Sequence, residues 1–440
     1  MQTEQRHDIL HTPKLESKLA RRDVLKLGST LTAASLIAPF LASCGKPLSS
    51  IQSKTLQVYI NAGHTYDAYQ QVIDKFQQDN AGWKVNLQPY QWPDMRTKIL
   101  ADFAAGNVPD LVEEPGGWVP EFAVSGRLRS LQPYIKGDGK SMGFPDDWQS
   151  YTVTRNTINN EVYGIQLHLT CMLLFYNKDM LSQAGITQPP ATWDEFLAAA
   201  KATAKKNVYG FAPNQDPGYA WPWFIQNNVQ YYDPVKKVVS MDTSDAYAAL
   251  QFQSDLIHKY KVAPVPIASA DYEGPQKLFS AQRAAMILTG PWDIKPILEG
   301  SPDLHWGIAP ALKGQKQATV AAGTSLFIPK AAKNPDMAWE LLKRLVAPDV
   351  ELAVTKEANM PMPRKSWVTN PSVQSMPYID SFAQGLKYAL DPGADLNKTG
   401  KSGAVTDLFN KAYQDALYRN LSASQVLKTF VQQANAALAQ

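Results

Sequence analysis

Two segments of the chain combine aromatic rings with hydrogen-bonding groups. Residues 215–224 mix Pro, Gly and polar side chains with four large rings, at Tyr219, Trp221, Trp223 and Phe224. Residues 285–293 read as a buried strand that ends in a Gly-Pro turn, which presents Trp292 beside Asp293. A pyranose has C–H faces that stack on rings and hydroxyls that donate and accept hydrogen bonds. Both segments therefore favour a carbohydrate ligand, although rings of the first one could equally anchor a core.

Motifs for catalysis, cofactor binding and metal binding are incomplete. Residues 139–141 read Gly-Lys-Ser, but a phosphate-binding loop needs a glycine where Tyr134 stands. The histidines show neither an HExxH pattern nor carboxylates at zinc-site spacing. Cys171 lies in an apolar stretch, which is typical of an inert, buried thiol. The sequence therefore predicts no cofactor and no metal ion.

Two pairs of neighbouring acids leave one enzymatic reading open. Glycosidases use two carboxyl groups on either side of the scissile bond. Glu113 with Glu114, or Asp146 with Asp147, could supply such a pair, although carboxyl groups adjacent in sequence rarely converge on one bond. A hydrolase therefore stays an alternative.

The charge balance argues against polyanionic partners. The chain has 43 Lys and Arg against 40 Asp and Glu, a formal charge of +3, and no block of like charge. Because a nucleic-acid-binding surface needs clustered bases, nucleic acid is a poor candidate partner. The two cysteines, Cys44 and Cys171, are too few for a disulfide framework or a thiolate metal site.

The first 44 residues read as an export signal. Arg21 and Arg22 precede an apolar run over residues 27–42, which is too short and broken for a comfortable membrane span. The paired arginines resemble a twin-arginine signal, and Leu-Ala-Ser-Cys at 41–44 resembles a bacterial lipobox. We therefore expect acylation of Cys44, a tether over residues 45–54, and a mature protein anchored to a membrane on its outer side.

Strand and helix patterns alternate after the tether. Residues 56–60 and 85–87 predict strands, residues 69–76 and 94–105 predict helices, and residues 109–112 predict a third strand. This order predicts a mostly parallel sheet covered by helices, with binding loops at the carboxyl ends of its strands. Residues 61–64 and 113–118 are those loops. Farther on, a capping box at Thr192 and Glu195 predicts a helix through residue 206.

From residue 55 to the end, the chain resembles the family 1 extracellular solute-binding proteins of bacterial ABC importers, a group that includes maltose-binding protein. The resemblance rests on segments that occur in a specific order, at residues 106–112, 162–165, 174–179, 290–292, 323–330 and 333–335. It implies an α/β, two-lobed, type II periplasmic-binding-protein-like fold. Each lobe has a mixed β-sheet flanked by helices, and the ligand lies in the cleft between them.

The resemblance also implies lobe boundaries and site residues. Lobe I would comprise residues 55–168 and 310–358, and lobe II residues 169–309 and 359–440, with crossings near 166–172, 307–312 and 356–363. Lobe I would offer His64, Glu113, Glu114, Trp118 and the backbone around Gly323 and Thr324. Lobe II would offer Asp216, Tyr219, Trp221, Trp292 as the stacking platform, Asp293 and Arg364. His64 and Thr170 replace residues that maltose-binding protein uses, which argues against maltodextrin itself.

The resemblance implies a protein that binds its ligand and releases it chemically unchanged. A monomeric two-lobed protein would bind a neutral sugar, close around it by hinge motion, and deliver it to a membrane permease. Two alternatives stay open: an exported glycan-cleaving lipoprotein, and the same fold serving glycerol phosphate or another small solute.

Overall fold

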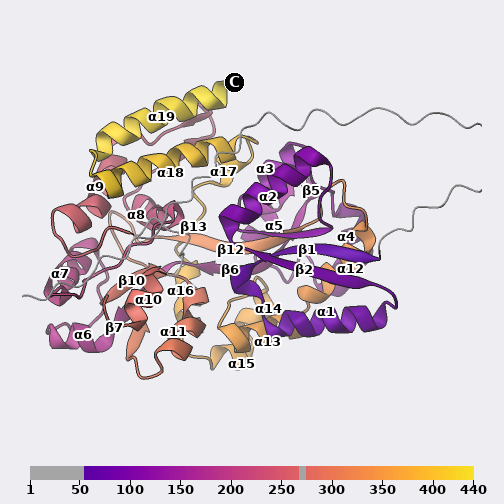
Figure 1. Cartoon of the computed structure of the whole chain (residues 1–440), viewed down its shortest axis with the longest axis horizontal. Helices are drawn as coiled ribbons and strands as arrows, with labels where there is room; N and C mark the ends of the chain where they lie inside the picture. The colour runs from indigo at the N-terminus through magenta and orange to yellow at the C-terminus, as the bar shows by residue number, and fades with distance from the viewer. Residues whose placement is uncertain (1–53, 267–273) are drawn as a thin grey trace, which may run out of the picture. The chain divides into compact units, whose positions relative to one another are not determined.

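The computed structural model describes residues 54–266 and 274–440 (Figure 1). Cys44, the expected export signal and nearly all of the tether lie outside the described residues, so those assignments stay predictions. Across the two described stretches, every helix is too short or too polar to span a bilayer.

The first sheet has six strands and is mixed. Its parallel part consists of β1 (Thr55–Asn61), β2 (Lys84–Tyr90) and β3 (Leu111–Glu114), as the alternating pattern predicts. β12 (Thr319–Phe327) lies antiparallel to β3 on one edge and to β6 (Gly164–Cys171) on the other. β13 (Ala389–Leu390) pairs with the first residues of β12. The predicted parallel strands thus share one sheet with β12 and β13, which come more than 200 residues after β3.

The helices beside this sheet follow from the sequence pattern. α1 (Asp67–Asp79) buries Tyr69, Ile73 and Phe76, which recur on one face. α2 (Trp92–Ala105) ends at Gly106, whose φ of 70° is the left-handed conformation that glycine tolerates at a helix end. α12 (Pro335–Leu345) and α13 (Pro348–Ala358) complete this core, and Figure 1 shows α1 and α12 at one end of the sheet.

The second sheet is smaller and antiparallel. β7 (Leu173–Asn177) is central, between β10 (Met286–Thr289) and β11 (Trp306–Ile308). A core of α7 (Trp193–Thr203), α8 (Trp221–Gln226), α9 (Ser244–His258), α18 (Ser402–Arg419) and α19 (Ala423–Ala439) packs beside it. The predicted capping box at Thr192 and Glu195 starts α7, which ends at Thr203 rather than at residue 206.

In the described part of the chain, at least three passages connect the two parts. β6 of the first sheet leads into β7 of the second, and β11 of the second sheet leads into β12 of the first. The third passage lies between Ile379, in the core beneath β1, and Phe382, in the core beside β7. Residues 360–379 therefore pack with the first lobe, in contrast to the expected boundary at 359.

The remaining elements are short. The helices are α3 (Trp118–Val124), α4 (Gln132–Met142), α5 (Ser150–Arg155), α6 (Lys178–Gln183), α10 (Gly274–Ser280), α11 (Ile294–Gly300), α14 (Lys365–Val368), α15 (Pro371–Gln374), α16 (Ile379–Leu386) and α17 (Ala394–Asn397). The 3₁₀ turns are η1 (Ala62–His64), η2 (Pro217–Ala220) and η3 (Pro291–Asp293), and two small hairpins pair β4 (Thr157–Ile158) with β5 (Glu161–Val162) and β8 (Tyr232–Asp233) with β9 (Val238–Val239). The three 3₁₀ turns matter most here because each one meets the cavity described next.

Candidate ligand-binding site

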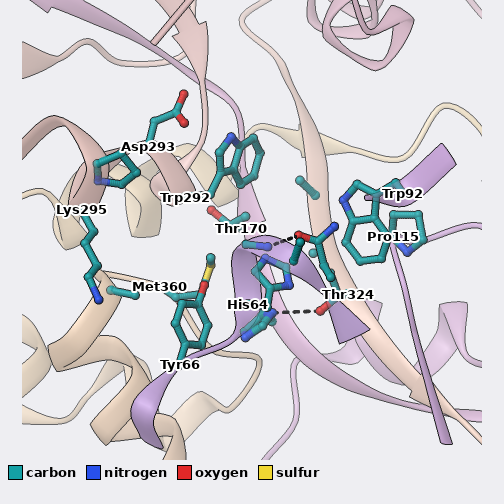
Figure 2. Close-up of a pocket in the computed structure, with 18 of the residues that line it drawn as sticks. His64, Tyr66, Trp92, Pro115, Thr170, Trp292, Asp293, Lys295, Thr324 and Met360 are labelled. Atoms are coloured by element: carbon teal, nitrogen blue, oxygen red, sulfur yellow. Dashed lines mark hydrogen bonds between the residues drawn. The ribbon is translucent and has the colours of Figure 1, made fainter. Parts of the chain in front are cut away.

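A cavity of about 780 Å³ lies where elements of the two sheets face each other. One wall, called the sheet wall below, comes from η1, β6 and β12; the other, called the loop wall, comes from η2, η3 and the start of α11. Figure 2 shows Trp92, Pro115 and Thr324 on one side and Asp293 and Lys295 on the other, with Trp292 between them. This size is typical of small-molecule sites.

His64 on the sheet wall is held by a buried carboxylate. It follows β1 in η1, where the Asn61 side chain accepts a hydrogen bond from the Gly63 N–H. Nδ1 of His64 lies 2.7 Å from Oε1 of Glu113, and Oε2 of Glu113 accepts the Asn61 N–H at 2.8 Å. Burial acts to raise the pKa of Glu113, but His64, His168 and the Asn61 N–H outweigh it, so this pKa is lowered. Glu113 thus lies behind His64, outside the cavity lining.

His168 connects the helix side of the sheet to the cavity. Its Nε2 lies 2.8 Å from the Tyr69 hydroxyl and its Nδ1 lies 2.9 Å from Oγ1 of Thr324, the residue opposite it on β12. Burial and the nearby His64 lower the pKa of His168, Glu113 opposes them, and together they bring it to about 3. The imidazole is therefore neutral at ordinary pH.

Gly323 brings β12 close to β6 beside this histidine. Its φ of 137° lies in the region that disfavours side chains, and a Cβ there would lie 2.2 Å from the His168 carbonyl oxygen. The β12–β6 register shifts immediately afterwards, between Thr324 and Ser325. Glycine at this position therefore sets where Thr324 meets the cavity.

Trp292 carries the aromatic surface of the loop wall. Its ring lies over Gly290, where a Cβ would come within 2.3 Å of the ring carbons. The indole is partly exposed and lines the cavity, while its Nε1 is buried with no hydrogen-bond partner among the described residues. Asp293 beside it accepts a hydrogen bond from the Thr289 hydroxyl at 2.6 Å. The turn thus presents a ring face to the cavity, with the Asp293 carboxyl group beside it.

Charged groups lie at the edges of the same cavity. Asp216 lines it and caps η2 by accepting the Gly218 N–H at 2.7 Å; burial raises its pKa and that N–H opposes the rise. Lys295 of α11 lies 3.5 Å from Glu357 of α13, so this ion pair joins the loop wall to a helix that packs with the first sheet. Glu357 also accepts the N–H groups of Asp67 and Ala68 at the start of α1.

The structure brings six of the expected residues to the cavity: His64, Asp216, Trp292, Asp293, Gly323 and Thr324. Two other expected residues, Glu114 and Trp118 in and after β3, stabilise the fold instead of lining the cavity. Glu114 is fully buried and accepts the N–H groups of Gly116, Gly117 and Trp118 at 2.6–3.0 Å. Trp118 packs in a core with Phe122, edge-on to Trp92. Neither lines the cavity, because Glu114 at the end of β3 and Trp118 at the start of α3 both point into the interior.

Three expected residues of the second lobe are also placed in cores. Tyr219 is 4% exposed, and the Trp221 ring stacks on Phe409 with centroids 4.5 Å apart. Arg364 is buried over the Trp148 ring, 3.2 Å from Glu351, and donates to the carbonyl oxygens of Met142 and Val346. These contacts hold Arg364 in the first-lobe core, away from the cavity lining.

Sequence reasoning did not select several residues that line the cavity. They are Tyr66, Trp92, His168, Thr170, Met172, Lys295 and Glu357. A signal existed for His168 and Thr170: residues 165–171 alternate apolar side chains with Gln166, His168 and Thr170. Such alternation places the polar set on one face of a strand.

One group in the described part of the chain has the residue types of a metal site. The potential ligand atoms of His64, Glu113 and His168 lie within 4.8 Å of one another. Nδ1 of His64 and both ring nitrogens of His168 are already within hydrogen-bonding distance of protein atoms. The arrangement is therefore satisfied as a hydrogen-bond network without an ion.

Comparison with known proteins identifies the family. The profile of the "Bacterial extracellular solute-binding protein" family matches residues 62–352. The chain belongs to this family of solute-binding proteins. A Brucella abortus (strain 2308) protein named as a binding protein is 27% identical to it over 296 residues, 64% of this chain and 69% of the relative.

Two further comparisons extend over most of this solute-binding protein. A maltooligosaccharide ABC transporter solute-binding lipoprotein of Streptococcus pneumoniae serotype 4 is 25% identical over 363 residues, covering 76% of this chain and 80% of the relative. The crystal structure of a Thermotoga lettingae ABC transporter solute-binding protein with α-D-tagatose has a TM-score of 0.78 at 25% identity, covering 88% of this chain and all of that one. The two-lobed fold expected from the sequence is thereby confirmed.

Proposed function

We propose that this solute-binding protein captures a neutral sugar in the cavity and delivers it to the permease of an ABC importer. The observation that carries the proposal is the partly exposed Trp292 ring, which faces hydrogen-bonding groups of the sheet wall across one cavity. A ring face packs on sugar C–H groups, and the surrounding polar groups bind hydroxyls. The relatives named for maltooligosaccharides and tagatose support a sugar ligand.

The charges around the cavity favour a neutral ligand over a phosphate. The lining includes the carboxylates of Asp216, Asp293, Glu299 and Glu357 but a single lysine, Lys295, which is paired with Glu357. Phosphate recognition uses clustered bases or a helix amino end. Arg364, which could have supplied a positive charge, is held in a core. Glycerol phosphate is therefore a weaker candidate.

The acid pairs considered for a glycosidase do not meet in the cavity. Glu113 lies behind His64 and Glu114 caps the loop after β3. Asp147 accepts hydrogen bonds from Ser366, and neither it nor Asp146 lines the cavity. The relatives are binding proteins, which supports capture without chemistry.

A thermal-shift screen of the protein tests this function. Mono-, di- and trisaccharides, including D-tagatose and maltotriose, are compared with glycerol phosphate and a chromogenic glycoside. A ligand that binds only the folded protein stabilises it by about 2.7 kcal/mol at 100 times its Kd. We expect at least one neutral sugar to raise the Tm, with no release of chromophore. A shift with glycerol phosphate alone, or turnover of the glycoside, would replace the proposal with one of its rivals.

We further propose that residues 1–44 direct export and that Cys44 carries the lipid anchor. The pneumococcal relative named as a lipoprotein supports this. A Cys44→Ser variant should move from the membrane fraction to the soluble exported fraction while keeping its ligand. Retention of the variant on the membrane would contradict the anchor.

A further inference from the structure

A series of hydrogen bonds in the sheet wall fixes which groups can donate into the cavity. The Tyr69 hydroxyl lies 2.8 Å from Nε2 of His168, and Nδ1 of His168 lies 2.9 Å from Oγ1 of Thr324. A neutral imidazole has one N–H donor and one acceptor nitrogen. The series of hydrogen bonds can therefore run from Tyr69 to Thr324, with each group donating to the next, or in the opposite direction.

Two observations select the direction from Tyr69 to Thr324. Tyr69 is 2% exposed, and in residues 54–266 and 274–440 its hydroxyl has no partner except His168. In the opposite direction Tyr69 would accept, and its own buried hydrogen would have no acceptor, which is unfavourable. In addition, Oε1 of Glu113 lies 3.8 Å from Nδ1 of His168, and this negative charge favours a hydrogen on Nδ1.

This direction leaves the Thr324 hydrogen available to the cavity. Oγ1 of Thr324 accepts the His168 Nδ1–H, and Thr324 lines the cavity. Within the described part of the chain, its hydroxyl makes no other hydrogen bond. Thr324 is therefore a donor whose orientation is set by Tyr69 and His168.

His64 provides the complementary acceptor. The Glu113 carboxylate 2.7 Å away favours a hydrogen on Nδ1, and in the tautomer with its one hydrogen there, Nε2 is an acceptor. His64 lines the cavity, and its ring centroid lies 4.7 Å from that of His168. The described residues supply no partner to Nε2. The sheet wall thus offers one donor and one acceptor from neighbouring residues.

We propose that Thr324 donates to an oxygen of the ligand and His64 accepts a hydrogen from a ligand hydroxyl, so that this pair determines ligand specificity. The inference rests on the proposed function and names the chemistry that the site selects: neighbouring oxygens of which at least one is a free hydroxyl. A ligand that is deoxygenated or O-methylated at these positions loses one or both contacts. Tyr69, His168 and Glu113 are positioning residues, because they act through Thr324 and His64.

The tautomers of His64 and His168 test the direction of the hydrogen-bond series without any ligand. Long-range ¹H–¹⁵N spectra of the ¹⁵N-histidine-labelled protein at neutral pH report which ring nitrogen carries the hydrogen, and His64→Gln and His168→Gln variants assign the signals. We expect the Nδ1–H tautomer for both residues. An Nε2–H tautomer of His168 would overturn the proposal.

Two variants of Thr324 test the contact with the ligand. The probe is whichever of maltotriose and D-tagatose gives the larger thermal shift, with its deoxy and O-methyl analogues. Thr324→Val keeps the β-branched shape but removes the hydroxyl, and we expect a loss of affinity of about tenfold or more. Thr324→Ser keeps the hydroxyl and should lose much less. Equal affinities of the Val and Ser variants for the unmodified sugar would overturn the role of the hydroxyl.

The analogues separate a specific contact from a general loss of structure. At least one analogue should bind the unaltered protein about tenfold more weakly than its parent sugar and bind Thr324→Val with little further loss, because the contact is already missing. If neither sugar binds the unaltered protein, the proposed function fails for these sugars, and the tautomer measurement still decides the direction of the hydrogen-bond series.

Discussion

The two walls of the cavity are built in different ways. The sheet wall takes His168 and Thr324 from two paired strands and fixes both by buried hydrogen bonds. The loop wall takes Asp216 and Trp292 from 3₁₀ turns, and the Trp292 ring lies over a glycine. We infer that the sheet wall supplies oriented polar contacts, whereas the loop wall supplies a ring surface and charge.

The difference also appears within the loop wall. Residues 215–224 and 290–293 both join rings to polar groups, but the rings of the first segment enter the second-lobe cores. There, η2 and α8 turn Trp223 and Phe224 toward α9 and α18. The second segment ends a buried strand at a Gly-Pro turn, which leaves its ring at the cavity. Composition alone therefore does not separate a core ring from a binding ring.

The largest expected effect is on a ring of the first segment. Trp223→Ala should lower the free energy of unfolding by about 3–5 kcal/mol, because the ring is 2% exposed and its removal leaves a cavity. Chemical denaturation measures this loss. Val235→Ala, at an exposed hairpin position, is the control and should change stability little. A similarly small change for Trp223→Ala would contradict its assignment to the core.

Trp292→Ala should show the opposite pattern. We expect the affinity for the sugar identified by the screen to fall by about tenfold to a hundredfold, because the stacking surface is lost. The unfolding free energy of the protein without sugar should change by less than about 1 kcal/mol, because the ring is partly exposed. Calorimetric titration and denaturation measure the two quantities. A large loss of stability with unchanged affinity would show that this ring belongs to a hydrophobic core and not to the binding site.

Acidification should weaken the sheet wall. Burial and the nearby His64 lower the pKa of His168 from 6.5 to about 3, so the unfolded chain binds a proton that the folded protein does not. Its stabilising contribution is fully present above pH 6.5 and is lost as the pH falls toward 3. This residue alone should cost about 2 kcal/mol between pH 7 and pH 5.

The pH dependence of the unfolding free energy measures that contribution. His168→Gln should have a shallower slope than the unaltered protein between pH 7 and pH 5, whatever its absolute stability. His305→Gln is the control, because His305 is exposed, and it should keep the original slope. Identical slopes for all three proteins would show that His168 titrates normally.

The smallest expected effect comes from Gly290→Ala. The added methyl group collides with the outer carbons of the Trp292 ring, which can shift at a cost of about 0.5–1.5 kcal/mol. We expect a twofold to tenfold loss of sugar affinity with little loss of stability. Gly300→Ala, where no atom lies within 4 Å of the added carbon, should leave affinity unchanged. Equal affinities for both variants would show that the ring position over Gly290 is unimportant.

The sequence by itself determined the local elements and their order. Leu56, Val58 and Ile60 alternate as β1 requires, and the capping box at Thr192 starts α7, because both patterns depend only on near neighbours. It also indicated the family and the position of Trp292, because a Gly-Pro turn after a buried strand is a local signal.

Only the tertiary structure decided which polar residues share the cavity. Arg364 and Glu114 read as binding residues, yet distant partners such as Glu351 and the N–H groups after β3 hold them in the interior. The sequence did not single out His168, yet β12, more than 150 positions away, places Thr324 against it. Burial and hydrogen bonding between distant segments are fixed by strand pairing across the sheet, and no neighbouring residue encodes them.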